Sequence, residues 1–366
     1  MSLNTRVLHV SSYTNHLSLA RPIYTHLSTS FKHTTTKTEI IKMGQGEEVK
    51  TREEPNVRIQ ERGEIFFFYR PKIDKQEAHS SDDVQRMYII LRPESGESSD
   101  IEVKQDPKSG KKSASSGQEG GQGEEQVNIK ENMLLRLIVM GKKSLPDPTK
   151  NKRGRPFWGF VELVTTKLED VKVALKGEEY DTATRGHRKN SPARAFGEGV
   201  YRILKHQAGN KKMHTHLIYK LEFPGEDEKN EVQESLNVKR EGSFLIQIKN
   251  PEKKGGAGGG FGGLQKKRKA VFPAHLQGEF GKLGYHAADP PDFLNYEGCE
   301  LLLIAASDDI EGELGLDLKT ETDWNAEEER KGSDDEEGEE CESCSDLVKT
   351  FGEGVSTRPL FQGTWA

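Results

Sequence analysis

Two histidines on one predicted strand have the spacing of a metal-ligand pair. His214 and His216 lie in a stretch, residues 213–223, where apolar and polar side chains alternate. Alternate residues of a strand face the same side of a sheet, so both imidazoles can reach one metal ion. The alternative is a pair of surface histidines on a polar sheet face. The third ligand is left open among His187, His206, His275, His286 and Asp289.

A second pattern with metal-ligand spacing is the CxxC motif formed by Cys341 and Cys344. A structural zinc site needs four ligands, and no second pair follows in this part of the chain. Carboxylates on both sides of the motif disfavour a reactive thiolate. We therefore expect two exposed thiols here. The chain has 3 cysteines, too few for a disulfide framework.

A basic stretch matches the core of an AT-hook. Arg153-Gly154-Arg155-Pro156 follows Lys152. Such a core lies extended in the narrow minor groove of DNA, where the negative potential attracts both arginines. An AT-hook needs flexible chain on both sides, however, and the strand-like segment 157–160 follows at once. The alternative is a basic turn that leads into a strand.

A second basic run follows the glycine-rich segment 255–263 and fits a nuclear-localisation or nucleic-acid patch. The alternative is a solvated loop. If nucleic acid is the partner, the residues expected to contact phosphate are Lys152, Arg153, Arg155, Lys266, Lys267, Arg268 and Lys269.

Cofactor and hydrolase motifs are missing from the sequence. The glycines at 255–263 are not followed by the Gly-Lys-Ser/Thr of a P-loop, and Gly197 and Gly199 lack the third glycine of a dinucleotide fingerprint. Asp289 and Asp292 have the residue type of a catalytic pair, but the prolines and aromatic residues around them favour a rigid connection anchored to the core. We predict no cofactor and no catalytic residue.

Charge is distributed unevenly along the chain. Residues 129–300 carry a net charge of +9, whereas residues 301–366 carry −14. One interpretation is an anion-binding core masked by its own tail; the other is a solvated surface with a solubilising tail. Ser333 precedes three acidic residues, so we predict phosphorylation by an acidophilic kinase, which would deepen the negative charge.

The composition predicts a core flanked by polar segments. Of 366 residues, 32% are hydrophobic and 31% are charged, which is too little apolar surface to order the whole chain. No apolar run approaches the roughly 18 residues of a membrane span. Residues 1–42 resemble a transit peptide in composition; alternatively, translation starts at Met43.

The hydrophobic pattern predicts an α+β fold, mainly an antiparallel β-sheet with two or three short helices. A proline after a possible N-cap, Ser191-Pro192, favours a helix over 191–206, although Gly197 and Gly199 weaken it. Further helices are predicted at 167–176 and 228–236. Strands are predicted at 65–69, 87–91, 133–140, 157–164, 213–223, 244–248 and 301–305.

The predicted strands fall into two blocks, 60–93 and 127–306, which we assign to a single core. The strands of the first block need partners from the second, and this argues against two small domains. The low-complexity segment 94–126 is read as an insertion. We expect residues 1–59 to form a disordered arm and residues 307–366 a disordered acidic tail.

Five stretches of the core resemble a plant protein family of uncharacterised function: 66–71, 83–93, 155–160, 191–201 and 288–303. The resemblance leaves out residues 1–42, the insertion and the tail. It implies no activity, no cofactor and no catalytic residue, and it favours Met43 as the start.

Three functions agree with these patterns. The first is a non-catalytic intracellular binding or adaptor protein, with a protein as the expected partner and nucleic acid as the next. The second is a metal-dependent enzyme that uses His214 and His216. The third is an organellar protein imported through residues 1–42. We expect no membrane partner, and a cytoplasmic or nuclear location unless residues 1–42 direct import to a chloroplast or mitochondrion.

Overall fold

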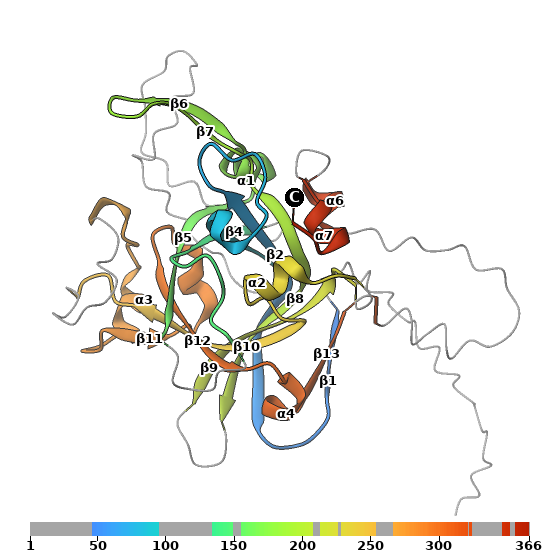
Figure 1. Cartoon of the computed structure of the whole chain (residues 1–366). Helices are drawn as coiled ribbons and strands as arrows, with labels where there is room; N and C mark the ends of the chain where they lie inside the picture. Colours follow the sequence, from blue (N-terminus) through green and yellow to red (C-terminus); the bar gives the residue numbers. More distant parts are fainter. Residues whose placement is uncertain are drawn as a thin grey trace, which may run out of the picture. The chain divides into compact units, whose positions relative to one another are not determined.

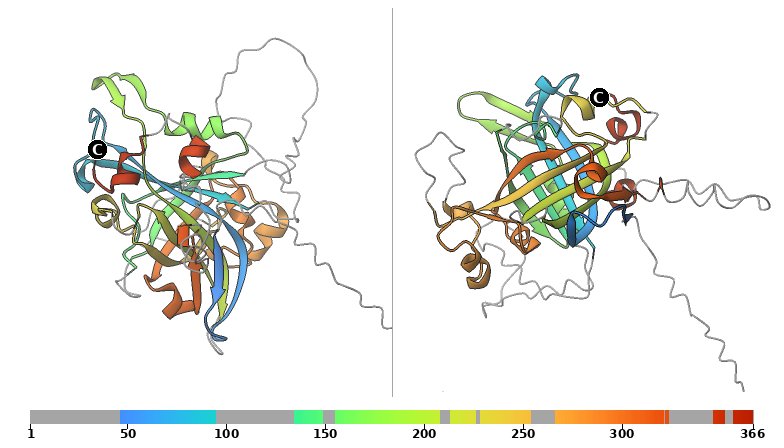
Figure 2. Two further views of the ribbon diagram at one scale, coloured as in Figure 1. Left: turned by 90° about the vertical axis from the view of Figure 1, so that its right-hand side faces the viewer. Right: turned by 90° about the horizontal axis from the view of Figure 1, so that it is seen from below.

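Eight antiparallel strands close into a barrel, which the right-hand view of Figure 2 shows nearly end-on. The strands are β2 (Asn56–Pro71), β3 (Val84–Pro93), β4 (Leu135–Met140), β5 (Phe157–Thr165), β8 (Arg194–Gln207), β9 (His214–Phe223), β10 (Glu241–Lys249) and β12 (Glu300–Ser307). The computed structural model describes residues 46–94, 134–148, 155–207, 213–225, 228–253, 266–320, 322–323, 346–351 and 356–365. The predicted mainly antiparallel sheet is confirmed, and its closure into a barrel is a more specific result.

The barrel consists of two four-stranded meanders joined at both edges. β2 to β5 pair in sequence order, and so do β8, β9, β10 and β12. β8 pairs with β2, and β12 pairs with β5. Tyr88 of β3 lies opposite Val139 of β4. This pairing places the two apolar blocks of the sequence in one continuous sheet.

Both faces of the first strands are buried, which explains their uninterrupted apolar sequence. In β2, Phe67 belongs to the interior cluster, whereas its neighbours Phe66 and Phe68 pack outside the barrel. There they contact the ring of Phe351 edge-on. The helices that contribute to this outer cluster are α1 (Leu168–Leu175), α6 (Asp346–Phe351) and α7 (Arg358–Gln362).

Shorter elements surround the barrel (Figure 1). β6 (Glu178–Thr182) and β7 (Gly186–Asn190) form a hairpin beside α1, β1 (Glu47–Lys50) pairs with β13 (Leu316–Lys319), and β11 (Tyr285–Ala287) pairs with β10. The remaining helices are α2 (Glu231–Ser235), α3 (Ala274–Glu279), α4 (Ile310–Leu314), η1 (Ser81–Asp83), η2 (Lys266–Arg268) and η3 (Pro291–Asn295). Within the described ranges, no helix has the length and apolar character needed to cross a lipid bilayer.

The predicted helix over 191–206 is wrong, because this segment forms β8. Phe196 and Tyr201 enter the barrel interior, and the two glycines allow close strand packing. A Cβ atom added to Gly199 would lie 2.0 Å from the carbonyl oxygen of Lys220 on β9. Glycine is therefore needed where β8 and β9 approach each other, and its presence indicates strand contact rather than a weak helix.

Two segments expected to be disordered are ordered where the structure describes them. α4 and β13 pack Ile310, Leu314 and Leu318 against the outer side of β8 and β9. The N-terminal arm contributes β1, whose Glu48 pairs with Arg62 and Arg202. A few apolar residues spaced among acidic ones suffice to make a packing face, although the average composition of 307–366 conceals them. Residues 95–133 lie outside the described residues.

Candidate functional site

Side chains fill the barrel interior. Phe67 contacts the rings of both Phe196 and Tyr219, and Tyr219 stacks on Phe244. The interior of an eight-stranded barrel holds either its own side chains or one small ligand, and here aromatic rings occupy it. A ligand site is therefore expected at the barrel ends or on the outer surface.

A buried ion pair lies in the interior, where β2, β4 and β8 meet η3. The guanidinium of Arg136 donates to both carboxylate oxygens of Glu61, at 2.6 and 2.8 Å. The hydroxyl of Tyr201 donates to the same carboxylate at 2.7 Å, and Arg136 also donates to the side-chain oxygen of Asn295 at 2.8 Å. Bidentate pairing of this kind fixes the relative position of the strands.

Asp289 and Asp292 have different partners. Asp289 accepts a hydrogen bond from Gln60 at 2.8 Å and pairs with Lys205 at 2.5 Å. Asp292 lies near the Arg136–Glu61 pair, and burial raises its pKa. Each acidic group has its own set of basic or amide neighbours, which favours the interpretation of this segment as an anchored connection.

The two histidines of the predicted metal-ligand pair differ in their exposure to solvent. His214 is exposed at the start of β9, whereas His216 is buried. The ring of His216 lies 2.9 Å from the Ser243 hydroxyl and 3.3 Å from the ring of His206. Burial lowers the pKa of His216 to about 3, so its imidazole is neutral at physiological pH. Among the described residues, no cluster of three histidine, cysteine or carboxylate side chains could hold a metal ion, and the metal site stays a prediction.

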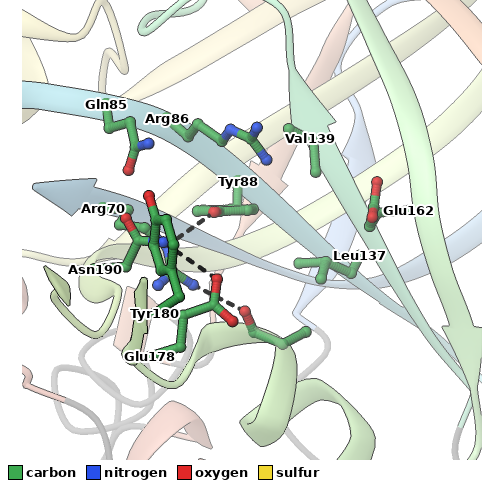
Figure 3. A pocket seen from close by; sticks show the side chains of 11 residues that line it. Arg70, Gln85, Arg86, Tyr88, Leu137, Val139, Glu162, Glu178, Tyr180 and Asn190 are labelled. Carbon is green, nitrogen blue, oxygen red and sulfur yellow. Dashed lines mark hydrogen bonds between the residues drawn. The ribbon is translucent and has the colours of Figure 1, made fainter. Parts of the chain in front are cut away.

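A hollow of about 440 Å³ lies on the outer face of β3, β4 and β5, beneath the β6–β7 hairpin (Figure 3). Apolar side chains of β4 contribute to its lining, and two tyrosines, Tyr88 and Tyr180, come from the barrel and the hairpin. Its volume is within the roughly 300–1,000 Å³ of small-ligand sites. The lining residues are Arg70, Gln85, Arg86, Tyr88, Leu137, Val139, Glu162, Ala174, Glu178, Tyr180 and Asn190.

Arg70 holds the elements around this hollow together (Figure 3). Its guanidinium donates to the Tyr88 hydroxyl at 3.0 Å and to the carbonyl oxygens of Ala174 at 2.9 Å, Lys176 at 3.2 Å and Ser191 at 3.0 Å. The first two carbonyls end α1, where a helix terminus favours a cation. Arg70 is therefore a positioning residue whose donors are already used.

A second hollow of about 420 Å³ continues the first, because Gln85 and Tyr180 line both. Asp74, from the β2–β3 connection, fixes the hairpin that forms its wall. The Asp74 amide donates to the carbonyl of Lys189 at 3.0 Å, and the Asp74 carboxylate pairs with Arg188. We call the two hollows together the outer groove. The second is lined by Lys72, Ile73, Gln85, Tyr180, Thr182, Arg185 and Arg188.

The outer groove is predominantly cationic. Five of its lining residues are Lys or Arg, against the two carboxylates Glu162 and Glu178. Glu162 is paired with Arg268 of the basic run. Within the part of the chain that the structure describes, Lys72, Arg86 and Arg185 form no ion pair. These three cations are available to an anionic ligand.

The basic run found in the sequence borders the same groove. Arg268 and Lys267 are exposed, and the Arg268 guanidinium lies 5.2 Å from the centre of the Phe160 ring on β5. Lys269 is half-buried, and Lys266 begins η2. Arg155 is exposed just before β5. Lys152, Arg153, Ser333, Cys341 and Cys344 lie outside the described residues.

Sequence reasoning missed Lys72, Arg86 and Arg185. They come from the β2–β3 connection, from β3 and from the turn of the β6–β7 hairpin, so no local motif joins them. The one local signal is the charged run 185–189, which carries several basic residues in a short hairpin.

The comparisons with known proteins add no relative. No protein-family model matches the chain, and neither a curated protein nor a solved structure matches it.

Proposed function

We propose that the chain is a non-catalytic binding protein that holds single-stranded nucleic acid in the outer groove. The supporting observation is the convergence on one groove of Lys72, Arg86 and Arg185, three cations that have no carboxylate partner among the described residues. Proteins that bind single strands combine such a cationic path with aromatic side chains on which bases stack.

Tyr180 is suitably placed for this role, because it is half-buried and lines both hollows. Tyr88 also lines the first hollow, but its ring is buried, so Tyr180 is the side chain on which a base would stack. Arg268 and Lys267 extend the positive charge beyond Glu162. A strand of nucleic acid crossing the groove would therefore meet cations near both ends and an aromatic ring between them.

The interior of the barrel supports a binding rather than a catalytic role. Three of the ionisable side chains inside it, Arg136, Glu61 and Tyr201, bond to one another. The groove has a different character, since Lys72, Arg86 and Arg185 are all exposed. We therefore expect a partner to bind the cationic outer groove rather than to react inside the barrel.

The test is the binding of a fluorescent 20-nucleotide single strand, followed by anisotropy at several salt concentrations. The double variant Arg86→Gln, Arg185→Gln should bind more weakly, and its slope of log K against log salt should be shallower by about 1.4, at roughly 0.7 per lost phosphate contact. The matched control is Arg58→Gln, Lys282→Gln, which removes two exposed cations outside the groove. Binding that is independent of salt, or equally weakened in the control, would refute the proposal.

A further inference from the structure

We propose that residues 324–345 of the chain occupy the outer groove and compete there with nucleic acid. The identity of the competitor rests on the proposed function; the docking itself does not. The groove is formed by residues that the structure describes, and residues 324–345 are the most acidic part of the sequence.

Charge complementarity is the first argument. Residues 324–345 contain ten Asp or Glu and two Lys or Arg. The groove opposes them with five cations, of which Lys72, Arg86 and Arg185 have no ion-pair partner in the described residues. An acidic peptide supplies the missing carboxylates, and a single ion pair at the surface contributes only about 0.2–1 kcal/mol. Several pairs along one segment are therefore needed for stable docking.

The attachment points of the segment are the second argument. Before it, Asp323 pairs with Lys220 of β9 at 2.8 Å. After it, the Leu347 amide of α6 donates to the Glu198 carboxylate of β8 at 3.0 Å. α6 contacts α1, and Ala174 of α1 lines the groove. The segment thus rejoins the described fold next to the helix that borders the groove.

Tethering makes weak ion pairs sufficient. Twenty-two residues can span up to roughly 70 Å when extended, which gives the segment a long reach from either anchor. A tethered segment has an effective concentration on the order of millimolar at such a site. Occupancy then needs only a modest intrinsic affinity, and a long polyanion can displace the segment because it makes more contacts.

Phosphorylation of Ser333 would regulate the docking of this segment. Phosphorylation adds a charge of about −1.5 to −2 and three acceptor oxygens. At a serine within an acidic segment that docks on arginines, the modification should strengthen docking and weaken binding of nucleic acid.

The first experiment compares two full-length variants with the same change in net charge. In one, the seven acidic residues at 334, 335, 336, 337, 339, 340 and 342 become the corresponding amides; in the control, the seven at 97, 100, 102, 106, 119, 124 and 125 do. We expect the first variant to bind the 20-nucleotide strand at least tenfold more tightly than the wild type, and the control to change less than threefold. An equal gain in both variants would show a general charge effect and overturn the inference.

The second experiment separates the inference from the proposed function. A labelled peptide of residues 324–345 is titrated into the seven-amide variant, with and without Arg86→Gln and Arg185→Gln. Binding that the two groove substitutions abolish supports docking even if no nucleic acid binds, in which case the proposed function alone fails. If the oligonucleotide binds but the peptide does not, the inference fails and the proposed function stands.

Discussion

The guanidinium of Arg70 donates a hydrogen bond to the hydroxyl of Tyr88 at 3.0 Å, which joins two neighbouring barrel strands on their outer side. The same guanidinium binds the carbonyl oxygens that end α1 and follow β7. One side chain therefore connects the barrel to both elements that wall the outer groove.

Replacing Arg70 by Met should destabilise this wall. The substitution leaves three carbonyl oxygens without their donor, and each hydrogen bond to a charged group contributes about 1.5–3 kcal/mol. We expect a loss of about 3 kcal/mol in the free energy of unfolding, measured by urea titration. Trypsin should also cut the β6–β7 hairpin faster. Arg58→Met, at an exposed position of β2, should change neither measurement.

Removing one member of the Arg136–Glu61 pair should cost more than removing both. Arg136→Met leaves the Glu61 carboxylate without its bidentate partner, and breaking a buried pair in this way costs about 3–5 kcal/mol. The double variant Arg136→Met, Glu61→Gln should recover part of that loss. A double-mutant cycle from chemical denaturation measures the coupling between the two side chains. Strictly additive effects would contradict a role of this ion pair in fixing the relative position of the strands.

Stability should fall in mild acid because of His216. Its pKa is about 3 in the folded chain and about 6.5 in an unfolded one, so between these values the unfolded state binds more protons. The free energy of unfolding therefore decreases as the pH falls from 6.5 towards 3, by up to about 1.4 kcal/mol per pH unit. At higher pH this penalty is absent.

The variant His216→Asn isolates this contribution, because asparagine can still bond to the Ser243 hydroxyl without taking up a proton in this range. Denaturation at pH 7.0, 6.0 and 5.0 should show a weaker dependence on pH in the variant than in the wild type. Both proteins keep His206 and His214, so the difference between the two slopes reports on His216.

Gly199→Ala should disrupt the contact between β8 and β9. The new Cβ atom would meet the Lys220 carbonyl oxygen at 2.0 Å, which forces a backbone shift in two barrel strands. We expect a loss of about 3 kcal/mol or more. Gly278→Ala in α3 is the control: its Cβ meets nothing within 4 Å, and alanine should stabilise the helix by up to about 1 kcal/mol. Equal thermal stabilities would contradict the close approach.

The sequence by itself determined most of the strands. The apolar run 65–69 and the alternation at 213–223 are local patterns, and both segments are strands in the structure. Ser191-Pro192 favours a helix over the segment that forms β8, and only the tertiary contact between Gly199 and the Lys220 carbonyl explains why glycine stands in this strand. Local propensity does not indicate which neighbouring strand will approach a glycine so closely that no side chain fits.

The tertiary structure alone decided the closure of the barrel and the location of the groove. Closure depends on β5 pairing with β12 and on β2 pairing with β8, contacts between strands more than a hundred residues apart. Lys72, Arg86 and Arg185 are likewise dispersed, so their convergence follows from the packing of a hairpin on a barrel face. Residue type and spacing determine a strand because its pattern is local, whereas a binding surface is a property of which strands become neighbours.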